Sequence, residues 1–392
     1  MFDFNRVIAR RGTHSAKWDN IAKIGGITAA DAIPMWVADM DFAAPPGVTA
    51  ALAEEVARAT HGYYADTGTW AEALCQWMAR RHALKIDPKW VSATPGVVSG
   101  LGLILQATSN PGDDVVVFPP AYHAFRKIIL ANERRILDAQ LVERGGRYAM
   151  DLDALKAKLT PRTKVVFFCS PHNPGGTVWS GDEIRALAKL CIERDLILVS
   201  DEIHCDLLFP GVRHTPTLTA APEVAERLIT CLGATKTFNL AGAHVGACVT
   251  TNPDLKRRLD ARIAAAGLAS YNLFGMIATE AAWRTGDAWL DALLAYLKAN
   301  RDHFDTRIEQ IVPGARSMRL DATYLAWVDF SKTGLAAEDV AARVAKRARI
   351  FANAGGDFGP GGATSLRFNF ATPRLILDEA LGRLAEAFRD RG

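Results

Sequence analysis

Apolar positions along the middle of the chain follow two kinds of pattern. In short runs nearly every residue is apolar, which predicts strands covered on both faces. Between these runs lie stretches in which apolar residues recur every three to four positions, as on the buried side of a helix. The predicted strands cover residues 91–94, 115–118, 165–168, 196–200, 228–232 and 244–250, and the helices between them include 100–109, 122–131 and 182–193. This alternation is typical of a doubly wound α/β fold with a mostly parallel sheet.

The segments on either side of this core show other patterns. Helical spacing over 47–60 and 69–82 precedes it, and residues 253–310 are predicted to be mainly helical. After these come predicted strands at 323–330, 349–355 and 365–371 and predicted helices at 335–350 and 375–390. We therefore expect an N-terminal arm (1–46) packing on the small domain, a large α/β domain (47–288) and a small C-terminal α+β domain (289–392).

Composition and charge narrow the classes of protein that remain. Of the 392 residues, 49% are hydrophobic and 23% charged, which is ordinary for a globular chain. The net charge of +3 argues against a nucleic-acid-binding or membrane-surface protein. No apolar run approaches the roughly 18 residues of a membrane span, and the first residues lack the apolar region of a secretory signal. The six cysteines never form a CxxC pair, so we expect reduced, mostly buried thiols in a cytoplasmic protein.

Three predicted strands are each followed by a polar side chain that could bind a ligand or take part in catalysis. Because ligands of open α/β sheets bind outside the carboxyl ends of the strands, these side chains are expected to meet in one crevice. They are Asn173, Asp201 and Lys236. Pyridoxal phosphate needs such a set: an amine for the Schiff base with its aldehyde, a buried carboxylate that keeps its ring nitrogen protonated, and an amide that donates to its ring oxygen.

Two further features complete the predicted cofactor site. Tyr122, just past the strand at 115–118, is placed to stack on the pyridine ring. The turn at 95–100, which includes Gly96, Val97 and Val98, opens a helix whose free N–H groups and dipole favour a phosphate.

Several residues have plainer interpretations. A lysine after a strand is usually a solvated charge, and His204 could equally be a buried, hydrogen-bonded histidine as a cofactor neighbour. A metal site built from His204 and Cys205 lacks a recognised ligand spacing, so no metal is expected. The glycine-rich segment 355–362 is interpreted as an approach to the following strand. The tryptophans at 70, 77 and 90 are expected in the core.

Five motifs, in this order, resemble those of the MalY/PatB family of pyridoxal-phosphate carbon–sulfur β-lyases, within the class I/II aminotransferase fold group. They are PMWVADMDF, TPGVVSGL, SPHNPGGTVW, SDEIHCDL and KTFNLAGAHVG. The resemblance runs from residue 12 to residue 373 and implies the fold of PLP-dependent transferases of fold type I. It also implies a homodimer whose active sites lie at the subunit interface.

The resemblance assigns roles to individual residues. Lys236 resembles the Schiff-base lysine, Asp201 the partner of the ring nitrogen, Asn173 the partner of the ring oxygen and Tyr122 the stacking aromatic. Arg367 is similar to the arginine that binds the substrate α-carboxylate, for which a guanidinium fork is suited. Trp36 is expected to line the substrate side, and His204 and Thr235 to lie near the cofactor.

The chain departs from the family pattern at two places. The family often reads HGxxGY where this chain has HGYYAD at 61–66, so the tyrosine that would reach the partner's phosphate is either Tyr64 or missing. A serine commonly precedes the lysine, whereas here Thr235 offers the hydroxyl.

The expected reaction is α,β-elimination from cystathionine or another cysteine S-conjugate, giving a thiol, pyruvate and ammonia. The cofactor residues alone would serve an aminotransferase equally well. A third hypothesis is that the chain is a regulatory protein, which retains the fold in order to bind a partner.

Overall fold

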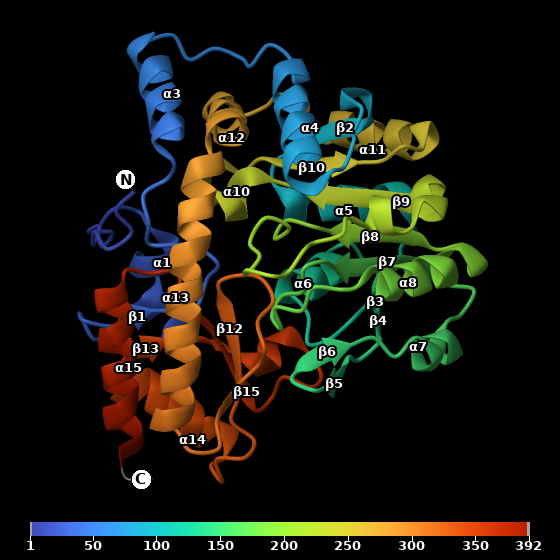
Figure 1. Ribbon diagram of the computed structural model, residues 1–392. Coiled ribbons are helices and arrows are strands. Elements are labelled where there is room, and N and C mark those ends of the chain that lie inside the picture. Colours follow the sequence, from blue (N-terminus) through green and yellow to red (C-terminus); the bar gives the residue numbers. More distant parts are fainter. Residues whose placement is uncertain (1, 390–392) are drawn as a thin grey trace.

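A seven-stranded sheet forms the centre of the computed structural model, which describes residues 2–389 (Figure 1). Its strands lie in the order β2-β10-β9-β8-β7-β3-β4. All strands run in parallel except β10, which pairs antiparallel with both β2 and β9. Their bounds are β2 Val91–Thr94, β3 Asp114–Val117, β4 Arg135–Asp138, β7 Thr163–Cys169, β8 Ile197–Asp201, β9 Leu228–Leu232 and β10 Gly246–Val249. The predicted α/β class is confirmed.

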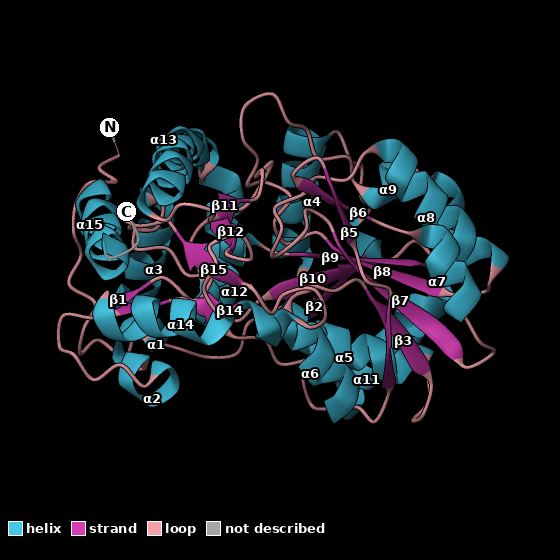
Figure 2. Cartoon of the chain, turned by 90° about the horizontal axis from the view of Figure 1, so that it is seen from below, coloured by secondary structure: helices cyan, strands magenta, loops and turns pink. Residues whose placement is uncertain are grey.

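Helices cover both faces of this sheet (Figure 2). One face packs against α5 (Val97–Thr108), α6 (His123–Ala131) and α11 (Pro253–Ala265), burying alternate residues of the central strands with Leu101, Phe125 and Leu259. The other face packs against α7 (Leu152–Lys158) and α8 (Gly181–Glu193) and, toward β2 and β10, against α4 (Gly68–His82) and α12 (Leu273–Thr285). This double cover explains why the central strands are apolar at every position.

A second, antiparallel sheet is built mainly from the last part of the chain. Its order is β11-β12-β15-β14, with β11 at Arg316–Ser317, β12 at Leu325–Asp329, β14 at Asn353–Ala354 and β15 at Ser365–Asn369. The long helix α13 (Asp287–Ile311) lies beside α15 (Arg374–Phe388), and both run past this sheet in Figure 1. The predicted helix at 375–390 matches α15, although residue 390 lies outside the described residues.

The first residues of the chain lie against the last part of it. Strand β1 (Ile33–Pro34) pairs in parallel with β13 (Ile350–Phe351), and the short helices α1 (Ala16–Asp19) and α2 (Ile21–Gly25) precede it. Helix α3 (Pro46–Ala57) then packs on α12. The segment between β1 and α3 contains Trp36, Val37 and Ala38, which line the cavity described below.

The structure differs from the sequence prediction at several elements. Strand β4 and the hairpin of β5 (Val142–Arg144) and β6 (Arg147–Ala149) were not predicted, because these strands are short and partly exposed. The strand expected at 349–355 is two strands, since β13 pairs with β1 and β14 with β15. The helix expected at 335–350 is α14 (Ala337–Ala342) followed by a π-helical turn, Arg343–Arg347.

The remaining elements are short. They are α9 (Thr217–Ala220), α10 (Ala234–Thr237) and 3₁₀ turns at Pro88–Trp90, Pro222–Arg227, Ala241–Ala243 and Gly355–Phe358. Trp70 and Trp77 are buried in the core as expected, whereas Trp90 is half-buried. Among residues 2–389, the structure has no helix that is both long enough and apolar enough to span a membrane.

Candidate active site

The strand register brings the predicted chemical residues to one edge of the large sheet. Cys169 at the end of β7 lies opposite Asp201 at the end of β8, and Asp201 lies opposite Cys231 of β9. The chain therefore leaves three neighbouring strands at the same level, and Asn173, Asp201 and Lys236 follow within a few residues. They border a cavity of about 340 Å³. The predicted residues that line it are Trp36, Gly96, Val97, Val98, Tyr122, Asn173, Asp201, His204, Thr235, Lys236 and Arg367.

Lys236 lies on α10, directly after β9. Its Nζ donates a hydrogen bond of 2.7 Å to the backbone oxygen of Ala38, in the segment that follows β1. Burial lowers the pKa of the amine to about 8, and the positive charge of Arg367 adds to this, while Asp39 and Asp201 oppose it. A lysine with such a pKa is partly neutral near neutral pH, as a nucleophile or base must be.

Asp201 is a buried carboxylate with few partners. Its Oδ1 accepts a hydrogen bond of 3.2 Å from the backbone N–H of Ile203. Burial raises its pKa to about 7, the charge of Glu202 raises it further, and the Ile203 bond and Lys236 lower it. A cation placed against this carboxylate would return the pKa toward its ordinary value, because an opposite charge favours the ionised form.

Arg367 joins the second sheet to the cavity. From β15, its Nη1 donates to Oδ1 of Asn173 at 2.9 Å, and its Nη2 donates to the backbone oxygen of Trp36 at 2.8 Å and to Oδ1 of Asn353 at 2.7 Å. The guanidinium carbon lies 4.8 Å from the ring centre of Phe358. Phe358 belongs to the glycine-rich segment 355–362, which accordingly forms a wall beside this arginine.

Arg367 is held in place before any ligand arrives. Its Nε is buried and has no hydrogen-bond partner among residues 2–389. Burial lowers the pKa of the guanidinium to about 10, so it stays charged at neutral pH. A buried cation with an unused donor is suited to bind a carboxylate.

The turn before α5 has the geometry of an anion site. Gly96 precedes the helix with φ of 90°, a conformation that favours glycine. The backbone of β10 passes close beneath, since a Cβ on Gly246 would lie 2.7 Å from the Val97 nitrogen. Val97, Val98 and Ser99 line the cavity with the first turn of α5, whose N–H groups have no partner within the helix.

Three histidines line the cavity, and burial keeps two of them, His204 and His123, in the neutral form by lowering their pKa. Burial lowers the pKa of His204 to about 3, with Lys236 and Arg367 adding to the effect, and burial lowers the pKa of His123 to about 4. The Nδ1 of His204 is buried without a partner among residues 2–389. His204 therefore faces the cavity as a neutral polar group.

Tyr64 lies away from this cavity. Its hydroxyl is 3.3 Å from Oε2 of Glu280, to which it donates a hydrogen bond, and its side chain is half-buried. Within one chain, the structure does not bring it to the other predicted residues.

Several groups in the cavity were not predicted from the sequence. The backbone oxygen of Ala38 and the side chain of Asn353 both bond predicted residues, and His123 and His244 line the wall. Asn353 stands opposite Arg367 in the β14–β15 pair, a register that no local pattern indicates. Backbone acceptors such as Ala38 leave no signal in side-chain patterns.

The donors and acceptors present fit pyridoxal phosphate. Because Oδ1 of Asn173 accepts from Arg367, its amide nitrogen is left to donate to an acceptor such as the ring oxygen. Asp201 offers a buried carboxylate to which no cation among residues 2–389 is bonded, and Lys236 offers an amine whose pKa is lowered by burial. Tyr122 and the turn at Gly96 supply an aromatic face and an anion site in the same cavity.

Comparison with known proteins agrees with this arrangement. Residues 31–384 match the family model "Aminotransferase class I and II". The chain is 37% identical to the cystathionine beta-lyase PatB of Bacillus subtilis, over 98% of this chain and 99% of that protein. It is 30% identical to the protein MalY of Escherichia coli, over 99% of both.

A solved structure shares the whole architecture. Cystalysin from Treponema denticola, crystallised with pyridoxal 5'-phosphate, has a TM-score of 0.95 and 31% identity, covering 100% of this chain and 99% of that one. The motifs, the fold and the similarity along nearly the full length agree, and the chain belongs to the aminotransferase class I and II family and, within it, to the MalY/PatB group.

Proposed function

We propose that the protein is a pyridoxal-phosphate-dependent carbon–sulfur β-lyase acting on cystathionine or another cysteine S-conjugate. The observation that carries this is one cavity in which Lys236, Asp201, Asn173 and Arg367 meet. The names of its relatives support the choice of reaction, since PatB is a cystathionine beta-lyase. Cystalysin, solved with pyridoxal phosphate, supports the choice of cofactor.

Each residue has a part in this reaction. Lys236 would hold the cofactor's aldehyde, Asp201 would face its ring nitrogen and Asn173 its ring oxygen. Tyr122 would lie against its ring. Gly96, Val97, Val98 and Thr235 would surround its phosphate, with His204 nearby. When bound, pyridoxal phosphate supplies an electron sink that stabilises negative charge at the substrate Cα.

The remaining steps fall to the substrate side. Arg367 binds the α-carboxylate and so orients the substrate beside Trp36. The Lys236 amine, once free, accepts the proton from Cα. The Cβ–S bond then breaks with its electrons on sulfur, and the thiolate takes a proton to leave as a thiol. The three-carbon fragment is hydrolysed to pyruvate and ammonia.

An aminotransferase would use the same residues, with Lys236 moving the proton to the cofactor instead of releasing a thiol. The decisive experiment incubates purified holoenzyme with cystathionine, or with an S-alkyl-cysteine, without any keto acid. We expect thiol and pyruvate in equal amounts, and none from Lys236→Ala. If turnover requires a keto acid, the protein is an aminotransferase and the lyase proposal is wrong. Negligible turnover with every substrate would favour the hypothesis of a regulatory protein.

The proposed active unit is a homodimer with shared active sites. Tyr63 is 92% exposed beside the half-buried Tyr64, and Phe274 and Val56 are further exposed apolar residues nearby along α12 and α3. This supports a second copy of the chain covering the segment and Tyr64 reaching the partner's phosphate. Light scattering would give the mass of the assembly. Tyr64→Phe should weaken cofactor binding if Tyr64 is shared.

Two further expectations remain proposals. We propose the division into an arm (1–46), a large domain (47–288) and a small domain (289–392), supported by the separate strand content of the two sheets. We also propose a cytoplasmic location, supported by six buried cysteines without disulfides. Limited proteolysis and fractionation of cells would test them.

A further inference from the structure

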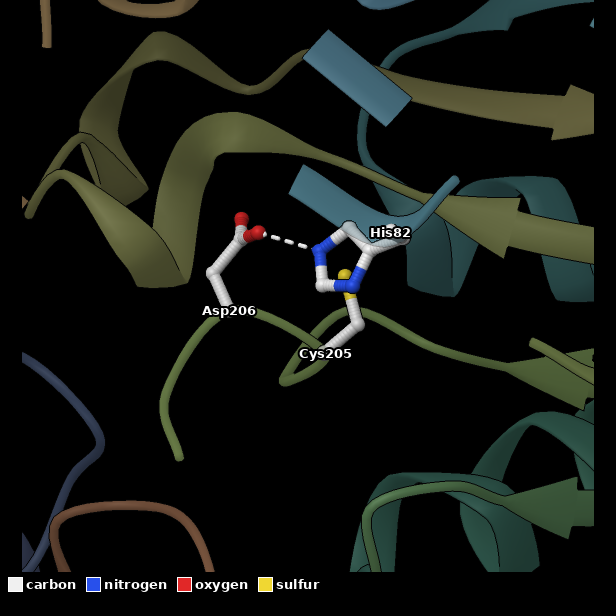
Figure 3. Close-up of side chains that lie close together, drawn as sticks. All are labelled: His82, Cys205 and Asp206. Carbon is white, nitrogen blue, oxygen red and sulfur yellow. Dashed lines mark hydrogen bonds and ion pairs between the residues drawn. The ribbon is translucent and has the colours of Figure 1, made fainter. Parts of the chain in front are cut away.

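The buried carboxylate of Asp206 does not line the cavity but lies between α4 and α10. Oδ1 of Asp206 is 2.6 Å from Nε2 of His82, the last residue of α4 (Figure 3). The Nε1–H of Trp77, one turn earlier on the same helix, donates to Oδ1 at 3.0 Å and to Oδ2 at 3.2 Å. The side chains of Asp206 and His82 are 3% and 5% exposed, so this pair is shielded from solvent.

The same carboxylate is bonded to the residue next to the predicted Schiff-base lysine. The hydroxyl of Thr237, which is fully buried, donates to Oδ2 of Asp206 at 2.7 Å. Thr237 and Lys236 are consecutive in the four-residue helix α10, which is too short to hold its own orientation. Thr237 therefore connects the turn that holds Lys236 to α4 through Asp206, whereas the amine itself donates to the backbone oxygen of Ala38.

A second pair of the same kind adjoins the first. Nε2 of His214 is 2.9 Å from Oε2 of Glu202, and the ring of His214 meets the ring of His82 edge to face, with centres 5.6 Å apart. Glu202 directly follows Asp201. The two buried carboxylate–histidine pairs are thus in contact with each other through their imidazole rings. One adjoins Lys236, which would hold the cofactor's aldehyde, and the other adjoins Asp201, which would face its ring nitrogen.

The spacing of His82, Cys205 and Asp206 would also admit a metal ion, since their ligand atoms lie within 4.8 Å of one another. The bonding argues for another role. Both oxygens of Asp206 already accept hydrogen bonds, from Trp77, Thr237 and the His82 pair. Burial holds the pKa of the Cys205 thiol well above its ordinary value, with Asp206 and Glu202 adding to this, whereas a metal binds the thiolate. Hydrogen bonds therefore account for the contacts of Asp206 with His82, Trp77 and Thr237 without a metal ion.

We propose that Asp206, held by His82 and Trp77, is a positioning residue that orients Lys236 through the Thr237 hydroxyl. The inference rests on the proposed cofactor, because the orientation matters only if Lys236 holds it. Reacting groups must stay within about 0.5 Å of their productive geometry, and a residue on a single helical turn reaches this only with support from behind. A buried, charge-assisted hydrogen bond to the adjacent residue is such a support.

The test compares two substitutions at Thr237. Thr237→Val keeps the shape and removes the hydroxyl, and Thr237→Ser keeps the hydroxyl. The readouts are the visible circular dichroism of the bound cofactor near about 420 nm, divided by its absorbance, and the rate at which cofactor is released. We expect Thr237→Val to lose about half or more of the dichroism and to release cofactor at least about threefold faster, and Thr237→Ser to stay close to the wild type.

A matched control separates positioning from general loss of stability. Thr279 is also fully buried, and its hydroxyl accepts a hydrogen bond from Nε1 of Trp70 at 2.8 Å instead of bonding Asp206. Thr279→Val should lower the melting temperature of the apoprotein while leaving the normalised dichroism unchanged. Equal spectra for Thr237→Val and the wild type, or equal changes in the two valine variants, would overturn the proposal. If mass spectrometry finds one zinc ion per chain, and this ion is lost in Cys205→Ser, a metal site would replace the positioning role.

The outcomes also separate this inference from the proposed function. A wild-type protein that takes up no pyridoxal phosphate would reject the function itself. A wild-type protein with a normal visible band, together with a valine variant that matches it, would reject only the positioning role.

Discussion

Arg367 of β15 donates a hydrogen bond of 2.9 Å from Nη1 to Oδ1 of Asn173, which lies in the loop after β7, and these two strands belong to different sheets. One would bind the substrate carboxylate and the other the cofactor's ring oxygen. The bond fixes the orientation of the Asn173 amide, because its oxygen is committed to the arginine. The proposed substrate-binding and cofactor-binding groups are therefore connected by a hydrogen bond. A substitution of Arg367 should affect both the binding of the substrate and the environment of the cofactor.

Replacing Arg367 by lysine tests this coupling. Lysine keeps the charge but cannot reach Asn173, Asn353 and the Trp36 oxygen together. We expect kcat/KM for amino-acid substrates to fall about 100-fold or more, mostly through KM, with a shift in the visible band of the bound cofactor. Steady-state kinetics and absorbance measure both. Arg319→Lys, at a side chain 63% exposed, is the control and should change neither.

Asp201 should make the apoprotein less stable as the pH rises. Its folded pKa of about 7 lies above its unfolded value of about 4, so the folded state binds the proton more tightly. The stabilisation is complete below about pH 4 and is lost as the pH rises through about 7. Asp201→Asn should therefore unfold at higher urea concentration than the wild type at pH 8 and at a similar concentration at pH 4.

Urea unfolding of the two apoproteins across this range gives the difference directly. The exposed Asp153→Asn serves as the control and should show no such dependence. A variant less stable than the wild type at pH 8 would contradict the assigned sign.

The lowered pKa of Lys236 should control how fast the apoprotein takes up pyridoxal phosphate. Only the neutral amine attacks an aldehyde, so the rate should rise about tenfold per pH unit below pH 8 and level off above it. Stopped-flow absorbance near about 420 nm follows the reaction. Because the charge of Arg367 helps to lower this pKa, Arg367→Met should move the plateau to higher pH. A rate still rising steeply above about pH 9, as for an ordinary lysine, would exclude the lowered pKa.

Gly246 should be required for the anion site. A Cβ there would lie 2.7 Å from the Val97 nitrogen and 2.9 Å from the Gly96 carbonyl carbon, both backbone atoms of the turn. Gly246→Ala must push this turn away, and we expect pyridoxal phosphate to bind about tenfold or more weakly. Fluorescence titration of the apoprotein measures it. Gly242→Ala, where a Cβ meets nothing within 4 Å, is the matched control and should bind normally.

Local sequence patterns predicted the elements that carry the site because those elements are strongly marked. The apolar run of 228–232 and the residues after it place Lys236 at a strand end, and β9 with α10 confirms that placement. Strand β4 was not predicted because its residues are exposed or only half-buried, so its sequence lacks a continuous apolar run. The break between β13 and β14 escaped it because two different partner strands, β1 and β15, determine where each short strand lies.

The sequence by itself determined the α/β class, the strand ends that bear Asn173, Asp201 and Lys236, and the family, because apolar periodicity and motifs are written in consecutive residues. Only the tertiary structure decided that Asn353 and the Ala38 oxygen join them, that Arg367 bonds Asn173, and that Asp206 lies behind Thr237. These contacts connect residues far apart along the chain. Strand register and burial bring them together, and neither leaves a mark in the local pattern.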